Sequence, residues 1–380
     1  MKIKDICTSV TDGSHNPPQG IEKSEYMMLS SKNIFDDEIT FDEPRFLSEK
    51  DFEREHKRTQ IAVGDVLLTI VGTVGRTAVV DEDMPAFALQ RSVAVLHPKN
   101  DICLPRFLMY ALRGKRTYIE NRAKGVAQKG IYLKEVSDID IPIPDISNQE
   151  IIINKLDKVN TIIKLRQEEL LALDNLIKAR FVEMFGDPVS NSYGFPEATL
   201  PELGELGRGV SKHRPRNDSK LLGGDYPLIQ TGDVANAGLY ITSYGGTYSE
   251  LGLKQSKMWN KGTLCITIAA NIAKTAILEF DACFPDSVVG FIANEKTNNI
   301  FIHYWFSFFQ AILESQAPES AQKNINLKIL SELKVIVPKK EKQDEFVEFI
   351  EQVYKSKVAV QKALDETQML FDSLMQEYFN

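Results

Sequence analysis

The stretch from Ile146 to Gly186, ISNQEIIINKLDKVNTIIKLRQEELLALDNLIKARFVEMFG, decides how this chain is organised. Its apolar residues recur at steps of three, four and seven residues, which is typical of a helix that packs along one seam. No Gly or Pro interrupts the stretch between Gln149 and Phe185. At about 1.5 Å per residue, the helix would be roughly 50 Å long, well beyond an ordinary globular helix. We therefore predict a long helix that joins two bodies.

The same pattern returns at the C-terminus, displaced by 194 residues. The sequence AQKGIYLKEVSDIDIPIP at Ala127–Pro144 aligns with AQKNINLKILSELKVIVP at Ala321–Pro338. At the same displacement, Gln149 aligns with Gln343, and the long apolar pattern follows both residues. The chain is therefore predicted to contain a two-fold internal repeat.

The two long helices are predicted to pair as an antiparallel coiled coil. Arg166 and Arg180 interrupt the apolar seam of the first helix, but they align with Val360 and Leu374 in the second. Two such helices can pack without placing two charges at the same level. The residues expected to form this seam are Leu156, Val159, Ile163, Leu170, Leu173, Ile177, Ile350, Val353, Val360, Leu364, Phe371 and Leu374.

Length and composition are those of a folded protein with two domains. The chain has 380 residues, of which 43% are hydrophobic and 26% are charged. Its four cysteines form no CxxC pair, so we expect reduced, mostly buried thiols. No apolar run approaches the roughly 18 residues of a membrane helix, and the N-terminus lacks a signal-peptide pattern. A cytoplasmic location is therefore expected.

Strand and helix patterns alternate in both bodies, which predicts an α/β (α+β) fold for each. In the first body, GDVLLTIVGTVGRTAVV at Gly64–Val80 indicates a strand, a turn and a second strand; GTLCITIAANIAKTAIL at Gly262–Leu278 matches it in the second body. The predicted domains are a first body at residues 1–145, a central helix at 146–186, a second body at 187–340 and a C-terminal helix at 341–380.

No motif in the sequence indicates catalysis. Asn16-Pro17-Pro18-Gln19 resembles the N-P-P-aromatic motif of amino-methyltransferases, but Gln19 replaces the aromatic residue that would stack on a flipped adenine. No GxxxxGK[ST] phosphate-binding loop is present, and the five histidines are scattered. We predict that the chain has no catalytic residues and no metal ligands.

Basic residues are clustered although the net charge is −8. The first cluster lies between Arg113 and Lys134, and the second is GRGVSKHRPRNDSK at Gly207–Lys220. Either cluster alone is equally compatible with a solvated helix face or a flexible basic loop. Clusters on both halves of a repeat favour nucleic-acid binding, because Lys and Arg neutralise phosphates.

Polar residues near strand ends are the candidates for contacts with DNA bases. Arg and Lys suit guanine, and Asn and Gln suit adenine, although each residue alone is equally compatible with a turn or a phosphate contact. The predicted DNA-binding residues of the first body are Ser14, His15, Lys32, Asn33, Arg76, Gln90, Arg91, Lys115, Arg116, Arg122, Lys124, Gln128, Lys129 and Tyr132. Those of the second body are Arg208, Lys212, His213, Arg214, Arg216, Gln230, Thr231, Asn271, Lys274, Gln322, Lys323 and Asn324.

The order of these segments resembles that of the specificity subunit of type I restriction–modification systems. The resemblance covers essentially the whole chain and lies in the arrangement. It includes the loop TDGSHNPP at Thr11–Pro18, the Gly64–Val80 segment, and the exit and Gln-Glu helix start at Ile141–Glu150. The second body departs from the pattern, because its turn lacks the Gly pair of VGTVG and VPKKEKQDEF at Val337–Phe346 replaces the second exit.

The resemblance implies a division of labour between subunits. Such a subunit is not an enzyme and binds no cofactor. It reads a bipartite, asymmetric DNA target with a fixed gap and binds two methyltransferase subunits, which use S-adenosylmethionine to methylate adenine N6. Restriction subunits, with their ATP and Mg²⁺, would allow the complex to cleave unmethylated DNA. The long helices would hold the methyltransferases and set the gap.

Two other interpretations remain open from the sequence. The first is a helical scaffold that joins other proteins and never touches DNA; the acidic net charge favours it, and the paired basic clusters disfavour it. The second is an enzyme, such as a stand-alone methyltransferase or nuclease, against which the missing motifs count.

Overall fold

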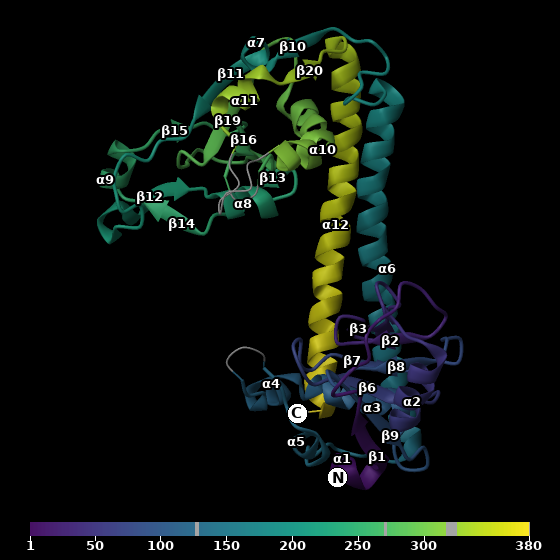
Figure 1. The fold of residues 1–380 in the computed structure, drawn as a ribbon. Coiled ribbons are helices and arrows are strands. Elements are labelled where there is room, and N and C mark those ends of the chain that lie inside the picture. Colours follow the sequence, from purple (N-terminus) through teal and green to yellow (C-terminus); the bar gives the residue numbers. More distant parts are fainter. Residues whose placement is uncertain (126–128, 270–271, 317–324, 380) are drawn as a thin grey trace. The chain divides into compact units, whose positions relative to one another are not determined.

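The computed structural model describes residues 1–125, 129–269, 272–316 and 325–379. The chain forms two compact units: unit 1 comprises Met1–Gln167 and Gln361–Asn380, and unit 2 comprises Glu168–Val360. Two helices of 40 residues, α6 (Ile146–Phe185) and α12 (Lys340–Phe379), each contribute one part to each unit. Each unit therefore contains one α/β body and a stretch of both long helices, which run in opposite directions (Figure 1).

Unit 1 is built around an antiparallel sheet whose strand order is β1-β9-β6-β7. These strands are β1 (Cys7–Asp12), β9 (Val93–Pro98), β6 (Val66–Thr69) and β7 (Thr77–Val79). Every residue of β6 is buried: α3 (Pro105–Gly114) packs against β6 and β7, while Leu67 belongs to a separate apolar cluster with Leu29 and Phe87. The remaining elements are α1 (Ile3–Ile6), β2 (Met27–Leu29), β3 (Ile34–Phe35), β4 (Glu38–Ile39), β5 (Arg45–Phe46), α2 (Glu49–Thr59), β8 (Phe87–Leu89), α4 (Arg116–Arg122) and α5 (Leu133–Ser137).

Unit 2 repeats this frame with one more strand, in the order β11-β19-β16-β17-β13. These strands are β11 (Gly204–Arg208), β19 (Val288–Ala293), β16 (Leu264–Thr267), β17 (Thr275–Leu278) and β13 (Tyr240–Ile241). The remaining elements are β10 (Glu197–Thr199), α7 (Leu200–Leu203), a 3-10 turn η1 (Ser219–Leu221), β12 (Leu222–Leu228), α8 (Thr231–Asn236), β14 (Gly246–Tyr248), α9 (Glu250–Lys254), β15 (Met258–Trp259), β18 (Ala282–Cys283), α10 (Asn299–Gln316), α11 (Leu327–Glu332) and β20 (Lys334–Ile336).

The internal repeat extends to individual hydrogen bonds in the central hairpin of each sheet. In unit 1 the Thr69 N–H donates to the Arg76 carbonyl, and the Arg76 N–H donates to the Thr69 Oγ1, both at 2.9 Å. Thr267 and Lys274 make the same pair of bonds in unit 2, at 2.9 and 3.1 Å. The residue before Arg76 or Lys274 has a positive φ, 95° at Gly75 and 57° at Ala273. Unit 2 therefore keeps the turn although alanine occupies this glycine position.

A buried glutamine fixes the start of each long helix in the same way. The Gln149 Oε1 accepts the Leu104 N–H at 2.9 Å, and its Nε2 donates to the carbonyls of Ile102 and Pro144, both at 2.8 Å. The Gln343 Oε1 accepts the Thr297 hydroxyl at 2.9 Å, and its Nε2 donates to the carbonyls 194 residues after those two. Both side chains are fully buried, and their two Nε2 bonds are equivalent, whereas the Oε1 accepts a backbone N–H in one joint and a hydroxyl in the other.

The long helices pack along apolar seams within each unit. In unit 1, Leu156 and Ile163 of α6 lie in one buried cluster with Phe371, Met375 and Phe379 of α12. In unit 2, the cluster combines Ile177 and Phe181 with residues such as Phe346, Ile350 and Val353. All twelve predicted seam residues are buried or half-buried. The predicted fold class is confirmed: two α/β bodies in tandem, each followed by a long helix, with the helices antiparallel.

Polar residues at the seam are matched by partners on the facing helix of the same unit. The Arg180 Nη2 lies 2.9 Å from the Glu345 carboxylate, and Lys357 forms an ion pair with Asp174. All four cysteines are free and buried. No described helix is both long enough and apolar enough to cross a membrane.

Candidate nucleic-acid interface

The loop that follows the first strand of each sheet occupies the same place in both units. After β1, the Gly13 N–H donates to Val93 O at 3.2 Å; after β11, the Gly209 N–H donates to Val288 O at 2.9 Å. A Cβ on Gly13 would lie 2.1 Å from a backbone oxygen of Leu89, and one on Gly209 would lie 2.3 Å from that of Pro285. Only glycine permits this close approach. The polar loop 13–18 and the basic loop 209–220 are therefore structural equivalents, a match that the sequence comparison did not find.

The basic loop of unit 2 is held at its base by two neighbouring side chains. The Gln255 Oε1 accepts the backbone N–H groups of Lys212 and His213 at 2.7 and 3.0 Å. The Ser256 hydroxyl donates to the Val210 carbonyl at 2.8 Å. These contacts fix the direction of the loop, although most of its side chains are exposed.

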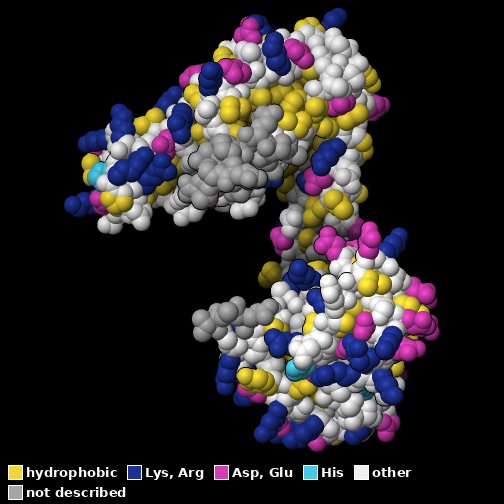
Figure 2. Space-filling model, in the orientation of Figure 1, with side chains coloured by type: hydrophobic (Ala, Val, Ile, Leu, Met, Phe, Trp, Pro, Cys, Tyr) yellow, Lys and Arg dark blue, Asp and Glu magenta, His cyan; other side chains and the backbone are white. Residues whose placement is uncertain are grey.

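The far part of the basic loop carries its own polar contacts. The His213 Nε2 lies 3.1 Å from the Asp218 carboxylate. The pKa of Asp218 is lowered, first by the N–H of Lys220 and then by His213. Figure 2 shows Lys and Arg side chains gathered at the end of unit 2 that carries α9, β12 and β14. This end of unit 2 therefore presents positive charge to solvent.

One acidic residue, Asp286, collects the arginines of this region. Its carboxylate forms ion pairs with Arg214, at 3.5 Å, and with Arg216, while its backbone carbonyl accepts the Arg208 Nε–H. The Arg214 side chain is 55% exposed and that of Arg216 is 46% exposed, so both retain a solvent-facing edge. The prediction included all three arginines and omitted Asp286, because 70 residues separate it from Arg216.

The other predicted residues of unit 2 lie at element ends. Gln230 is exposed at the start of α8, and Thr231 is half-buried beside it. Lys274 is half-buried in the β16–β17 hairpin, and Lys212 is exposed. Four predicted residues lie outside the described part of the chain: Asn271, Gln322, Lys323 and Asn324.

In unit 1 the structure brings three predicted cations to one pocket. Arg76, Arg116 and Lys129 line it, together with Glu120 and the turn 72–74. The Gly72 N–H donates to the Lys129 carbonyl at 3.1 Å, which ties two segments distant in sequence. The pocket therefore combines three positive charges with one negative charge.

Residues around this pocket extend the basic surface. Lys124 is exposed, and it exchanges two backbone hydrogen bonds with Gly130. The Arg122 guanidinium lies 4.5 Å from the Tyr118 ring centroid, and Tyr132 is 71% exposed. Lys115 is half-buried, and Gln128 lies outside the described residues.

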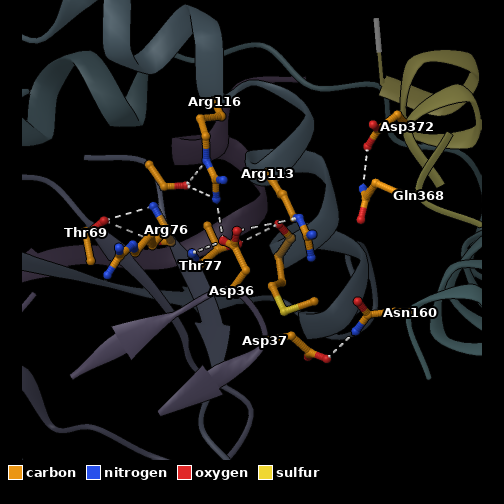
Figure 3. A network of polar contacts seen from close by, with 12 residues as sticks. Asp36, Asp37, Thr69, Arg76, Thr77, Arg113, Arg116, Asn160, Gln368 and Asp372 are labelled. Carbon is orange, nitrogen blue, oxygen red and sulfur yellow. Dashed lines mark hydrogen bonds and ion pairs between the residues drawn. The ribbon is translucent and has the colours of Figure 1, made fainter. Parts of the chain in front are cut away.

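The acidic turn between β3 and β4 forms an ion pair with Arg116, one of the arginines that line this pocket (Figure 3). Asp36 pairs with Arg116, whose guanidinium also donates to the Gly75 carbonyl at 3.1 and 3.0 Å. Asp37 accepts from Asn160 of α6 at 2.9 Å. Arg116 therefore supports the hairpin turn that presents Arg76. Asp36 was not predicted, and 80 residues separate it from Arg116.

Two predicted residues of unit 1 hold their own loops together. Asn33 is 5% exposed; its Oδ1 accepts the Ser30 N–H at 3.1 Å, and its Nδ2 donates to the Asp42 carbonyl at 2.9 Å. Ser14 is also buried, and its backbone bonds to Leu89 and Arg91. These contacts favour a structural role for both residues.

The neighbouring predicted residues are more accessible. Lys32 and Arg91 are exposed, and Gln90 is half-buried. His15 is exposed and lies 2.7 Å from the Asp12 carboxylate. The Arg76 guanidinium lies 4.8 Å from the centroid of the Phe35 ring.

The described residues offer little for metal or thiol chemistry. Among residues 1–125, 129–269, 272–316 and 325–379, no group of three or more His, Cys, Asp or Glu side chains could hold a metal ion. Burial raises the pKa of the Cys7 and Cys103 thiols to about 12, which disfavours the reactive thiolate.

The sequence of this chain matches a known protein family. The sequence model of the type I restriction modification DNA specificity domain matches residues 1–175 and 197–367. The chain belongs to this family. The two matched ranges correspond to the two halves of the internal repeat, so each half contains one DNA specificity domain.

Individual relatives agree with the family assignment. The type I restriction enzyme EcoBI specificity subunit of Escherichia coli is 27% identical over 186 residues, which are 47% of this chain and 38% of that subunit. The putative type I restriction enzyme MjaX specificity subunit of Methanocaldococcus jannaschii is 22% identical over 359 residues, which are 90% of this chain and 83% of that protein. The chain thus matches well under half of the EcoBI specificity subunit, but most of MjaX.

Solved structures share the fold of these specificity domains. The crystal structure of the type I restriction–modification S subunit from M. genitalium has a TM-score of 0.59 at 14% identity, covering 100% of this chain and 95% of that chain. A structure described for complex assembly and conformational transition of the type I R-M system has a TM-score of 0.56 at 17% identity, covering 100% and 97%. Both specificity domains and both long helices are therefore elements of a known fold.

Proposed function

We propose that this specificity subunit reads a bipartite, asymmetric DNA target with a fixed gap. The observation that carries the proposal is the pair of equivalent loops after β1 and β11. They have the same backbone anchor at Gly13 and Gly209, but one is polar and the other is strongly basic. Two equivalent frames that present different side chains would read two different half-sites.

The long helices would set the gap between the half-sites. Each of α6 and α12 begins in one unit and ends in the other, and each has an apolar seam in both. Recognition modules on one face of DNA bind about one helical turn apart, roughly 34 Å. Helices of 40 residues are long enough for such a spacing, at about 1.5 Å per residue.

We further propose that the subunit directs two adenine methyltransferase subunits, and restriction subunits where the system has them, to the target. The chain would contribute recognition alone and no catalytic group. S-adenosylmethionine, ATP and Mg²⁺ would then bind to the partner subunits, in the cytoplasm where the DNA is. The exposed apolar residues of α6, such as Leu165 and Leu171, offer surface for such partners.

The test is a map of methylated adenines in DNA from cells that carry this chain with its neighbouring methyltransferase gene. Cells with the methyltransferase alone provide the control. The proposal predicts a new motif in two unlike parts separated by a fixed gap. If the methyltransferase is present and bound to the chain but no new motif appears, the chain is a scaffold and the proposal is wrong.

A further inference from the structure

We infer that Asp286, with the arginines that it holds, forms a guanine-reading site in unit 2. This inference rests on the proposed function and assigns a base class to one part of it. Arg208, Arg214 and Arg216 all contact Asp286 through its carboxylate or its backbone carbonyl. Two guanidinium groups pair with the carboxylate and the third donates to the backbone carbonyl, so the cluster keeps a surplus of two positive charges that favours an electron-rich partner.

The cluster stands on rigid backbone, as base reading requires. The N–H groups of Gly209 and Val210 donate to the carbonyls of Val288 and Phe284, which lie two residues after and two residues before Asp286. The Arg214 Nη1 also donates to the Ser211 carbonyl at 2.6 Å, near the base of the loop. The loop that carries Arg214 and the segment that carries Asp286 are therefore held together by backbone hydrogen bonds at the end of β11 and the start of β19. A preorganised side chain loses little entropy when it binds.

The chemistry of a supported arginine favours guanine. A guanidinium group has five N–H donors in a planar fork, and a carboxylate occupies only some of them. The Arg214 Nη1 donates to the carbonyls of Ser211 and His213, but the Arg214 and Arg216 side chains are still 55% and 46% exposed, so their remaining donors can offer an edge to a base. In the major groove, guanine presents the acceptors O6 and N7, which match such an edge with two parallel hydrogen bonds. A loop meant only for phosphates would gain nothing from a carboxylate, which repels them.

The other half of the repeat carries the opposite charges at the same positions. The last residue of the first strand is Asp12 in unit 1 and Arg208 in unit 2; each faces the second residue of the neighbouring strand. Arg91 is the counterpart of Asp286, because Ser92 and Ser287 accept equivalent bonds from Ile70 and Ile268. The acid and the arginine thus exchange places between the two units at these two positions, which is expected of groups that distinguish one half-site from the other.

The experiment compares methylation maps for the wild-type chain, Asp286→Asn, Arg216→Lys and the control Glu205→Gln, each with the methyltransferase. Glu205 lies on β11 of the same unit and pairs with Lys257 at 3.3 Å, so the control removes an exposed carboxylate outside the cluster. Arg216→Lys keeps the charge and removes the planar fork. It tests the inference even if Asp286→Asn disturbs folding.

In the wild type, we expect a G·C pair in the half-site read by unit 2. Sites with this pair should be methylated in preference to other sites by roughly 5- to 150-fold, the range of one good bidentate contact. Asp286→Asn and Arg216→Lys should each remove most of that preference and leave the other half-site unchanged. Glu205→Gln should match the wild type. Replacing the guanine by 7-deazaguanine, which lacks the N7 acceptor, should weaken binding of the wild type but not of Asp286→Asn.

Three outcomes would overturn the inference. The second half-site could lack any G·C pair, or both cluster variants could keep the wild-type preference. The variants could also lower methylation of all sites equally, with a smaller salt dependence of DNA binding, which would indicate phosphate contacts alone. In each case a bipartite wild-type motif would leave the proposed function standing. A wild-type map without any bipartite motif would reject the proposed function itself.

Discussion

At the scale of single residues, the best-defined features are the two buried glutamines, Gln149 and Gln343. Each makes three hydrogen bonds, and each uses its Nε2 to join two backbone carbonyls across the joint between a body and its long helix. A buried amide is stable only when such bonds are made, because an unpaired polar group in the interior costs free energy. The glutamines therefore hold the joints together.

We expect Gln149→Ala to lower the free energy of unfolding by roughly 2–4 kcal/mol, since it leaves the Leu104 N–H and two carbonyls without their partner. Urea unfolding of the full chain measures the effect. The control is Gln361→Ala, which removes an exposed contact with Asp365 on the surface of α12 and should cost about 0.5 kcal/mol or less. If both variants lost the same free energy of unfolding, the buried joint would stabilise the fold no more than an exposed contact does.

At the scale of elements, the long helices, their seam and the strands of the central hairpins followed from the sequence pattern, but the strand order of the sheets and the ion pairs of the loops did not. Apolar spacing is a local signal, so it identified α6, α12 and the seam residues. The partners of Arg216 and Arg116 are Asp286 and Asp36, which lie 70 and 80 residues away. Only the sheet topology brings such residues together. The same limit explains why the sequence predicts Asn33 as a DNA-binding residue, although its side chain is buried.

Leu156→Ala should lower the free energy of unfolding by roughly 2–5 kcal/mol, because Leu156 is fully buried among α12 residues of unit 1. Leu171→Ala provides the comparison on the same helix. Leu171 is 62% exposed, so its truncation should change stability by about 0.5 kcal/mol or less. Thermal and urea unfolding should agree on the order. If both variants were equally stable, the seam would not hold the helices.

At the scale of the whole molecule, an acidic chain carries basic loops at defined positions. The net charge of −8 therefore describes the molecule poorly as a partner for DNA. Each α/β body carries a loop after its first strand, fixed at Gly13 in one body and at Gly209 in the other, and the two loops differ in their side chains. Two continuous helices join the bodies. Under the proposed function, helix length would set the spacing of the two half-sites, and the loops would determine which bases are read.

We expect a longer pair of helices to lengthen the gap in the target without changing either half-site. Four residues, slightly more than one helical turn, would be inserted after Leu173 in α6 and after Lys357 in α12, since Lys357 pairs with Asp174 of the same unit. The added length is roughly 6 Å, or about two base pairs. Methylation mapping reads both quantities at once. Altered half-site sequences with an unchanged gap would contradict the role of the helices as a ruler.

The similar hydrogen bonds of Gln149 and Gln343 at the two joints have a consequence for how such genes can change. Because the glutamine Nε2 joins two equivalent carbonyls in both joints, we expect that the segment between them can be exchanged without redesign of the scaffold. A recombination event that exchanged the segment between the joints would place new loops in an old frame in a single step. Under the proposed function, such a chain could read a new DNA target sooner than by stepwise mutation of its loops.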